Sequence, residues 1–176
     1  MRKNRTEIYL TIFIIAVIAV TASAYLLTRE KSSTSMFPDK LGDMRLALYR
    51  DGDVAMTEVK GLHGNNPGVK IEKAYIANYR SSPDSKAKFW VSESRTSEEA
   101  VALLETMNIK VGKTGMFSDS TPMNIEGITV YFVSGNPELG LYHYFYAKDK
   151  RVFWIQMDNP DEAYRLNFMR EAIKRI

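Results

Sequence analysis

The side chains best suited to acid–base or metal chemistry in this sequence are its two histidines, because it contains no cysteine. His63 lies in Leu62-His63-Gly64-Asn65, which is typical of a loop, and a loop histidine is a candidate ligand or general base. Such a histidine can equally serve only to hydrogen-bond its own loop. His143 lies among tyrosines in a strand-like run, where a half-buried histidine more often packs than reacts.

The two histidines do not belong to a recognisable catalytic or metal-binding motif. A zinc site needs three or four ligands, and two histidines far apart in the sequence do not supply them. There is no Gly-x-Ser-x-Gly motif and no glycine-rich phosphate loop. We therefore predict no metal site and no cofactor, and an enzyme is the function that the sequence supports least.

The two tryptophans are a second pair of candidate site residues. Trp90 lies in Phe89-Trp90-Val91-Ser92 and Trp154 in Phe153-Trp154-Ile155-Gln156. Large aromatic side chains usually form a core, which is one interpretation of this pair. The other is a groove, lined by Trp90, Trp154 and His143, that binds an apolar or aromatic ligand or a segment of a partner.

The residues that follow each tryptophan predict an internal repeat. Both aromatic runs precede a helix N-cap, then a glutamate three residues later, then an alanine: Thr96-Ser97-Glu98-Glu99-Ala100 and Asn159-Pro160-Asp161-Glu162-Ala163. Pairs of tyrosines spaced by four precede both runs, at 75–79 and 142–146. These matches favour two units, 44–108 and 109–176. Two unrelated hairpins, each followed by a capped helix, would also look alike.

Each unit reads as four strands followed by a helix. Alternating apolar residues predict strands at 44–49, 54–60, 69–80, 87–92, 109–116, 124–134, 141–146 and 151–157. Asp51-Gly52 predicts a type I′ turn between the first two strands. Thr96 and Asn159 are the expected N-caps, with Glu99 completing a capping box. The expected fold is α+β, an antiparallel sheet with the helices packed on one face.

The last hairpin is apolar on both of its faces. A two-residue turn at Lys148-Asp149 would pair His143 with Trp154. A sheet covered on one face only should be polar on the other, so we expect both faces to be covered. The loop 61–68, which carries His63, is the candidate cover for the face of Trp154.

The N-terminal segment belongs to a different class. Ile8–Leu27 is uncharged and long enough to cross a bilayer as a helix, and the basic residues before it predict a cytoplasmic N-terminus. We therefore expect a cytoplasmic tail at 1–7, a single-pass membrane anchor at 8–27, a linker at 28–38 and an extracytoplasmic domain at 39–176. The alternative is a signal peptide cleaved near Ala24, after the small residues Ala22-Ser23-Ala24, which would release a secreted protein.

Charge excludes one class of function. The net charge of +3 resides in residues 1–31, which hold five basic and two acidic side chains, so the remainder is neutral. A nucleic-acid-binding domain needs a basic surface to neutralise phosphates, and this domain has none to offer. The sequence favours a membrane-anchored extracytoplasmic module that binds a protein partner or acts as an accessory. Binding of a small apolar ligand or lipid through an aromatic face is the alternative.

Overall fold

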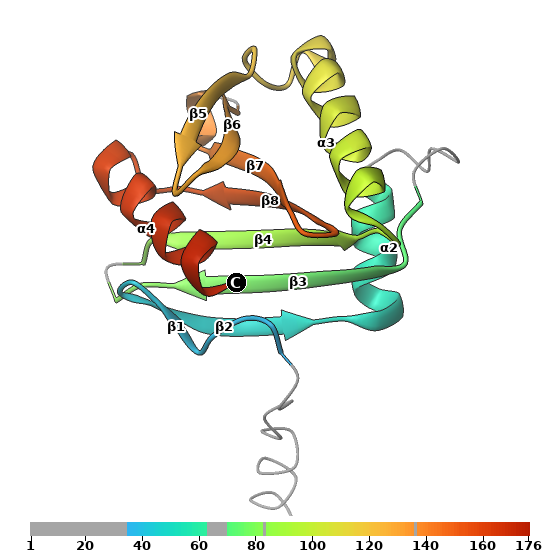
Figure 1. The fold of residues 1–176 in the computed structure, drawn as a ribbon. Coiled ribbons are helices and arrows are strands. Elements are labelled where there is room, and N and C mark those ends of the chain that lie inside the picture. The colour runs from blue at the N-terminus through green and yellow to red at the C-terminus, as the bar shows by residue number, and fades with distance from the viewer. Residues whose placement is uncertain (1–34, 63–69, 83, 136) are drawn as a thin grey trace, which may run out of the picture. The chain divides into compact units, whose positions relative to one another are not determined.

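A computed structural model of the chain describes residues 35–62, 70–82, 84–135 and 137–176 (Figure 1). The expected anchor at 8–27 and His63 lie outside these residues, so both remain predictions. Among the residues described, no helix is long and apolar enough to cross a membrane. Residues 36–176 form one compact unit, which is described below.

An eight-stranded antiparallel sheet forms the centre of this unit, which confirms the expected α+β class. The two halves of the chain meet at β4 and β8, the strands that carry the two aromatic runs. In spatial order the strands are β1 (Lys40–Leu41), β2 (Met44–Arg50), β3 (Lys73–Arg80), β4 (Lys86–Glu93), β8 (Arg151–Met157), β7 (Tyr142–Lys148), β6 (Ile128–Ser134) and β5 (Thr121–Ile125).

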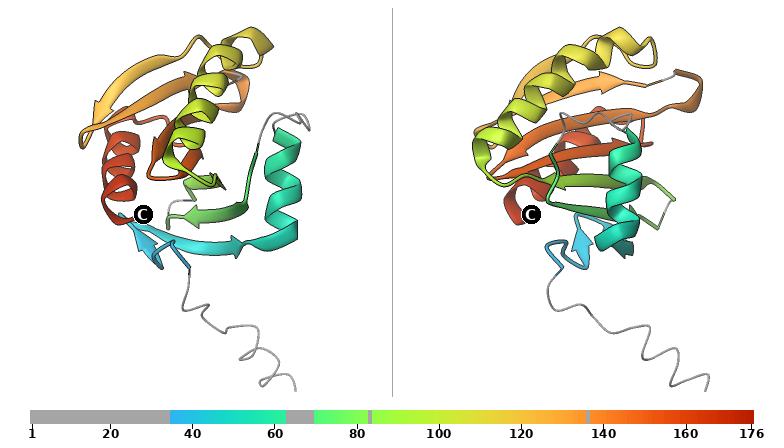
Figure 2. Two further views of the ribbon diagram at one scale, coloured as in Figure 1. Left: turned by 45° about the vertical axis from the view of Figure 1, so that its right-hand side comes forward. Right: turned by 90° about the vertical axis from the view of Figure 1, so that its right-hand side faces the viewer.

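Helices cover both faces of the sheet, so the expectation that they pack on one face is wrong. On one face lie α2 (Gly52–Leu62) and α3 (Ser97–Val111), and on the other lies α4 (Glu162–Arg175) (Figure 2). Leu103 of α3 packs with Val152 of β8, whereas Phe168 of α4 packs with Phe153 on the opposite face of the same strand. The apolar residues on both faces of β8 require this arrangement, because each face must be buried.

The segment expected as the second strand, 54–60, is instead part of α2. Gly52 has a φ of 63° and begins the helix rather than a hairpin turn. Ala55 and Val59, four residues apart, are the buried positions and pack against Ala74 and Ile76 of β3. The buried residues of this segment therefore follow the spacing of a helix, 3.6 residues per turn, and not the alternation from which a strand was expected.

Two other segments differ from expectation. The strand expected at 109–116 does not form, because α3 continues to Val111 and a 3-10 turn, η1 (Gly112–Thr114), follows it. The strand expected at 124–134 is divided into β5 and β6 by a tight turn at Glu126 and Gly127, both of which have positive φ. A second 3-10 turn, η2 (Pro137–Leu139), precedes β7.

The helix caps confirm one expectation and correct another. Thr96 caps α3, since its hydroxyl accepts from the backbone N–H of Glu99 at 3.2 Å. The N-cap of α4 is Asp161, whose carboxylate accepts from the N–H of Ala163 at 2.9 Å. Asn159 lies two residues earlier and accepts from the N–H of Asp161, so the expectation that it caps the helix is wrong.

The hairpin of β7 and β8 turns at Asp149 and Lys150, one residue later than expected. His143 therefore pairs with Gln156, and Phe145 pairs with Trp154. The expected pairing of His143 with Trp154 is wrong by two residues. A shift of two keeps every side chain on its expected face, because the alternation has a period of two.

The sheet order is symmetrical about β4 and β8, but the helices are not. α2 connects β2 to β3, whereas the described part of the equivalent connection, between β6 and β7, holds only the 3-10 turn η2. The helices that follow β4 and β8 lie on opposite faces of the sheet. The internal repeat of 44–108 and 109–176 therefore stays a prediction.

Candidate functional site

A cavity of about 570 Å³ lies between α2, α3 and the sheet, within the size range of small-molecule sites. Its lining is largely apolar and comes from elements far apart in the sequence. The helices and η1 contribute Val59, Leu62, Leu103, Thr106, Met107, Lys110, Val111 and Thr114, the segment after η1 contributes Met116 and Phe117, and the strands contribute Trp90, Ser92, His143, Val152, Trp154 and Gln156.

Three of the four candidate site residues from the sequence line this cavity. Trp90 of β4 and Trp154 of β8 are direct cross-strand partners, so both indoles lie side by side on one face of the sheet. His143 of β7 lies on the same face. The fourth candidate, His63, lies outside the described residues. The groove expected from Trp90, Trp154 and His143 therefore has a geometric counterpart.

The indole of Trp154 is held by the side chains around it. Its Nε1 donates a hydrogen bond of 3.1 Å to Nδ1 of His143. The ring of Phe145 stacks on it at 5.0 Å between centroids, and the ring of Phe117 meets both Trp154 and His143 edge-on. The orientation of Trp154 is thus set by contacts with protein, before any ligand is considered.

Burial lowers the pKa of His143 to about 4, so the ring is neutral at ordinary pH. Because Nδ1 accepts from Trp154, the proton of the neutral ring resides on Nε2. A Cβ at position 135 would lie 3.1 Å from this Nε2, so a larger residue at Gly135 would press on the ring of His143. His143 is therefore a neutral wall residue, and its usual role as an acid or base near neutral pH is suppressed.

The indole of Trp90 is held by a carboxylate from α2. Its Nε1 donates to Oε1 of Glu58 at 2.6 Å, and Nζ of Lys88 lies 2.7 Å from the same oxygen. The ammonium of Lys88 also lies over the Trp90 ring, 4.4 Å from its centroid. Partial burial would raise the pKa of Glu58, but the hydrogen bonds from Lys88 and Trp90 outweigh it and lower that pKa. Both indole N–H groups are thus committed to protein acceptors.

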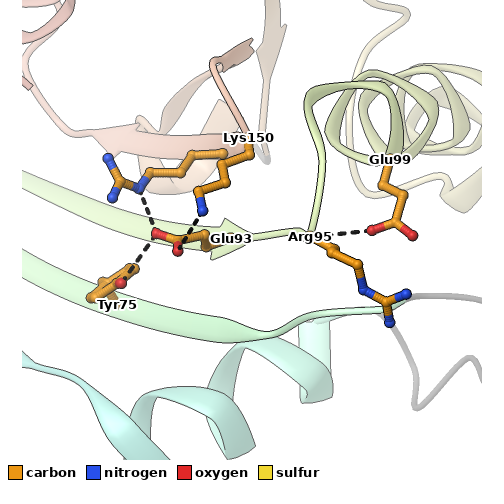
Figure 3. Close-up of polar contacts among 6 residues, drawn as sticks. Tyr75, Glu93, Arg95, Glu99 and Lys150 are labelled. Carbon is orange, nitrogen blue, oxygen red and sulfur yellow. Dashed lines mark hydrogen bonds and ion pairs between the residues drawn. The ribbon is translucent and has the colours of Figure 1, made fainter.

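A polar cluster on the opposite face of the sheet fixes the strand ends that lead into α3 (Figure 3). The carboxylate of Glu93 accepts from Nε of Arg151 at 2.8 Å and from the hydroxyl of Tyr75 at 3.2 Å, and Nζ of Lys150 lies 3.8 Å away. The cluster therefore joins β3, β4 and β8 at the point where the chain leaves β4 for α3. Its groups are paired with one another, which indicates a structural role.

The described residues include few groups suited to a metal site or to acid–base chemistry at the cavity. No group of three potential metal ligands occurs among them. The described lining of the cavity includes no aspartate or glutamate, and its histidine is held neutral. The cavity therefore presents mainly apolar surface from its described residues.

Sequence reasoning missed part of the lining. Lys110 and Val111 fell in a segment expected to be a strand, and Phe117 directly follows that segment. A signal was present, since Leu103, Met107, Lys110 and Val111 continue the helical spacing that begins at Ala100. Gly112 is the C-cap of α3, and Gly115, with a φ of 69°, ends η1.

Comparison with known proteins adds a likeness of fold. No protein-family model matches the sequence, and no curated protein matches it. Among solved structures, the chain is similar to the extracellular domain of PknH from Mycobacterium tuberculosis, with a TM-score of 0.50 and 8% sequence identity over 77% of this chain and 87% of that one. At this identity the likeness concerns the fold alone.

Proposed function

We propose that this protein is a membrane-anchored extracytoplasmic binding module, and that its cavity takes a small, largely apolar ligand. The observation that carries the proposal is the cavity itself, which is lined by both tryptophans of the chain. It is of ligand size and is lined by three separate parts of the fold: α2, α3 with the segment after it, and the sheet.

The two tryptophans that form the floor of the cavity, Trp90 and Trp154, support an apolar ligand. Because Glu58 and His143 accept from the two indole N–H groups, Trp90 and Trp154 offer their ring faces rather than their donors. Neither is fully buried, so a ligand would remove more aromatic surface from water. Burial of apolar surface stabilises a complex by roughly 25 cal/mol per Å² before the costs of association.

Membrane attachment is the second part of the proposal and rests on the sequence. The uncharged run at 8–27 is proposed to remain in the mature chain and to leave the domain close to the bilayer, where apolar ligands and lipids concentrate. The intact mass of the protein from its own membrane tests this. A mature chain that begins near Tyr25 would show a cleaved signal peptide instead.

A segment of a partner protein is the second candidate occupant. Leu62 and Met116 line the cavity and are 57% and 64% exposed. Exposed apolar side chains beside a pocket are a common feature of protein interaction sites. Co-purification in mild detergent distinguishes the two occupants, because a protein partner would be recovered in place of a small molecule.

Native mass spectrometry of the protein purified from its own host tests ligand binding directly. We expect the wild-type chain to carry an additional small mass. Met107→Trp should abolish it, because Met107 lines the cavity and the larger side chain would fill it. Val101→Trp, on the exposed side of the same helix, is the matched control and should retain the mass.

The proposal fails if the wild-type chain retains no ligand and added apolar compounds leave its tryptophan fluorescence unchanged. It also fails if Met107→Trp and Val101→Trp retain the same mass to the same extent, because the ligand would then lie elsewhere.

A further inference from the structure

The cavity has an uneven distribution of charge. Lys110 is the only charged side chain among its described lining residues. The nearby ammonium of Lys88 is neutralised by Glu58, whereas none of the ion pairs formed by described residues includes Lys110. A single positive charge therefore stands at the edge of an apolar cavity whose floor is two indole rings.

We propose that the ligand is an amphiphilic monoanion, with an apolar or aromatic body on Trp90 and Trp154 and one acidic group at Lys110. This inference rests on the proposed function, because it names the chemical class that the same cavity would take. A carboxylate would gain a charge-assisted hydrogen bond from the ammonium, whereas a neutral amide or alcohol would gain less.

The position of Lys110 on α3 suits this role. It is exposed, so its ammonium stays hydrated at the mouth, and an anion bound there would not be fully desolvated. Met107 and Val111, its neighbours on the same helix face, line the apolar part of the cavity. One helix surface therefore offers an apolar contact and a positive charge to the two ends of one small molecule.

Lys110 also lies in the last turn of α3, where a basic residue compensates the helix dipole. That role would affect the stability of the protein but would not distinguish an acid from its amide. A ligand pair that differs only in charge therefore separates binding from helix stabilisation.

The experiment uses intrinsic fluorescence, because the only two tryptophans of the chain both line the cavity. The full-length protein in detergent is titrated with octanoate and octanamide, and separately with 2-naphthoate and 2-naphthamide. We expect each acid that binds to do so about tenfold more tightly than its amide, as one charge-assisted contact would give. The two pairs show whether the site prefers a flexible chain or a ring.

Three variants complete the test. Lys110→Gln should remove the preference for the acids, and Lys110→Arg should retain it. Lys113→Gln removes an exposed lysine of η1 that does not line the cavity, and it should behave as wild type. Equal affinities for acid and amide in the wild-type chain, or a preference unchanged in Lys110→Gln, would overturn the inference while leaving the proposed function intact. Absence of binding by all four probes would count against both.

Discussion

Trp90 and Trp154 are direct cross-strand partners at the centre of the eight-stranded sheet, and their indoles form the floor of one cavity. Their N–H groups are held by different parts of the fold. That of Trp90 is bound by Glu58 of α2, and that of Trp154 by His143 of β7. The junction of the two halves of the sheet is thus also the place where the candidate site is built.

Replacing either tryptophan by phenylalanine removes its indole N–H group, and the two replacements should lower the stability of the protein by different amounts. Trp154→Phe leaves Nδ1 of His143 buried without its donor, which should cost about 1–3 kcal/mol beyond the loss of aromatic contact. In Trp90→Phe, the carboxylate of Glu58 keeps its contact with Lys88, so that variant should be less destabilised. Equilibrium unfolding in urea measures both, and equal losses would contradict the role given to the bond between Trp154 and His143.

His143 should make stability depend on pH in the mildly acidic range. Its folded pKa is about 4 because of burial, whereas an unfolded histidine titrates near 6.5. The unfolded chain therefore binds a proton that the folded chain does not, and stability present above about pH 6.5 should fall by roughly 3 kcal/mol as pH drops to about 4. His143→Gln keeps an acceptor for Trp154 and should remove this slope, whereas His63→Gln should keep it. Thermal unfolding across this range provides the measurement.

Glu93 should make stability depend on pH in a more acidic range than His143 does. Burial would raise its pKa, but the hydrogen bond and charge of Arg151 outweigh burial and lower it. Its contribution is therefore present above the unfolded value of about 4.3 and is lost as pH falls through the folded value. Glu93→Gln should cost about 2 kcal/mol near neutral pH and flatten the stability profile in acid.

Glu72→Gln is the matched control for Glu93, because Glu72 and Arg95 are both exposed and their charged atoms lie 3.6 Å apart. Loss of such a surface pair should change the free energy of unfolding by less than about 1 kcal/mol. If both variants lose the same stability, the cluster of Glu93 does not hold the strand ends together.

Removing either helix cap, Thr96 or Asp161, should lower the free energy of unfolding by a similar amount. Thr96→Ala and Asp161→Ala should each cost about 1 kcal/mol, because each removes an acceptor for backbone N–H groups in the first turn of its helix. Ser97→Ala, one residue beyond the first cap and exposed, should be nearly neutral. Guanidinium denaturation of the three variants tests this. An unchanged midpoint in Asp161→Ala would place the start of α4 elsewhere.

Local sequence patterns were sufficient for much of the sheet and for one helix cap. The expected strand at 151–157 coincides with β8, and those at 44–49 and 87–92 match β2 and β4 closely. Thr96 follows from its type and its spacing to Glu99. Alternation also places Trp154 and His143 on one face, because a period of two survives the error in the turn. These features depend on neighbours in the chain, which the sequence displays directly.

Tertiary structure decided the remainder. Residues 54–60 alternate well enough for a strand, yet they form a helix whose Ala55 and Val59 pack against β3. α3 and α4 lie on opposite faces because both faces of β8 must be buried. No local signal in the sequence indicates which helix covers which face. The pairing of β4 with β8 brings Trp90 beside Trp154 across a long stretch of chain. The sequence by itself determined the candidate residues, and long-range pairing decided that Trp90, Trp154 and His143 share one cavity, because contacts between distant segments leave no periodic trace in either segment alone.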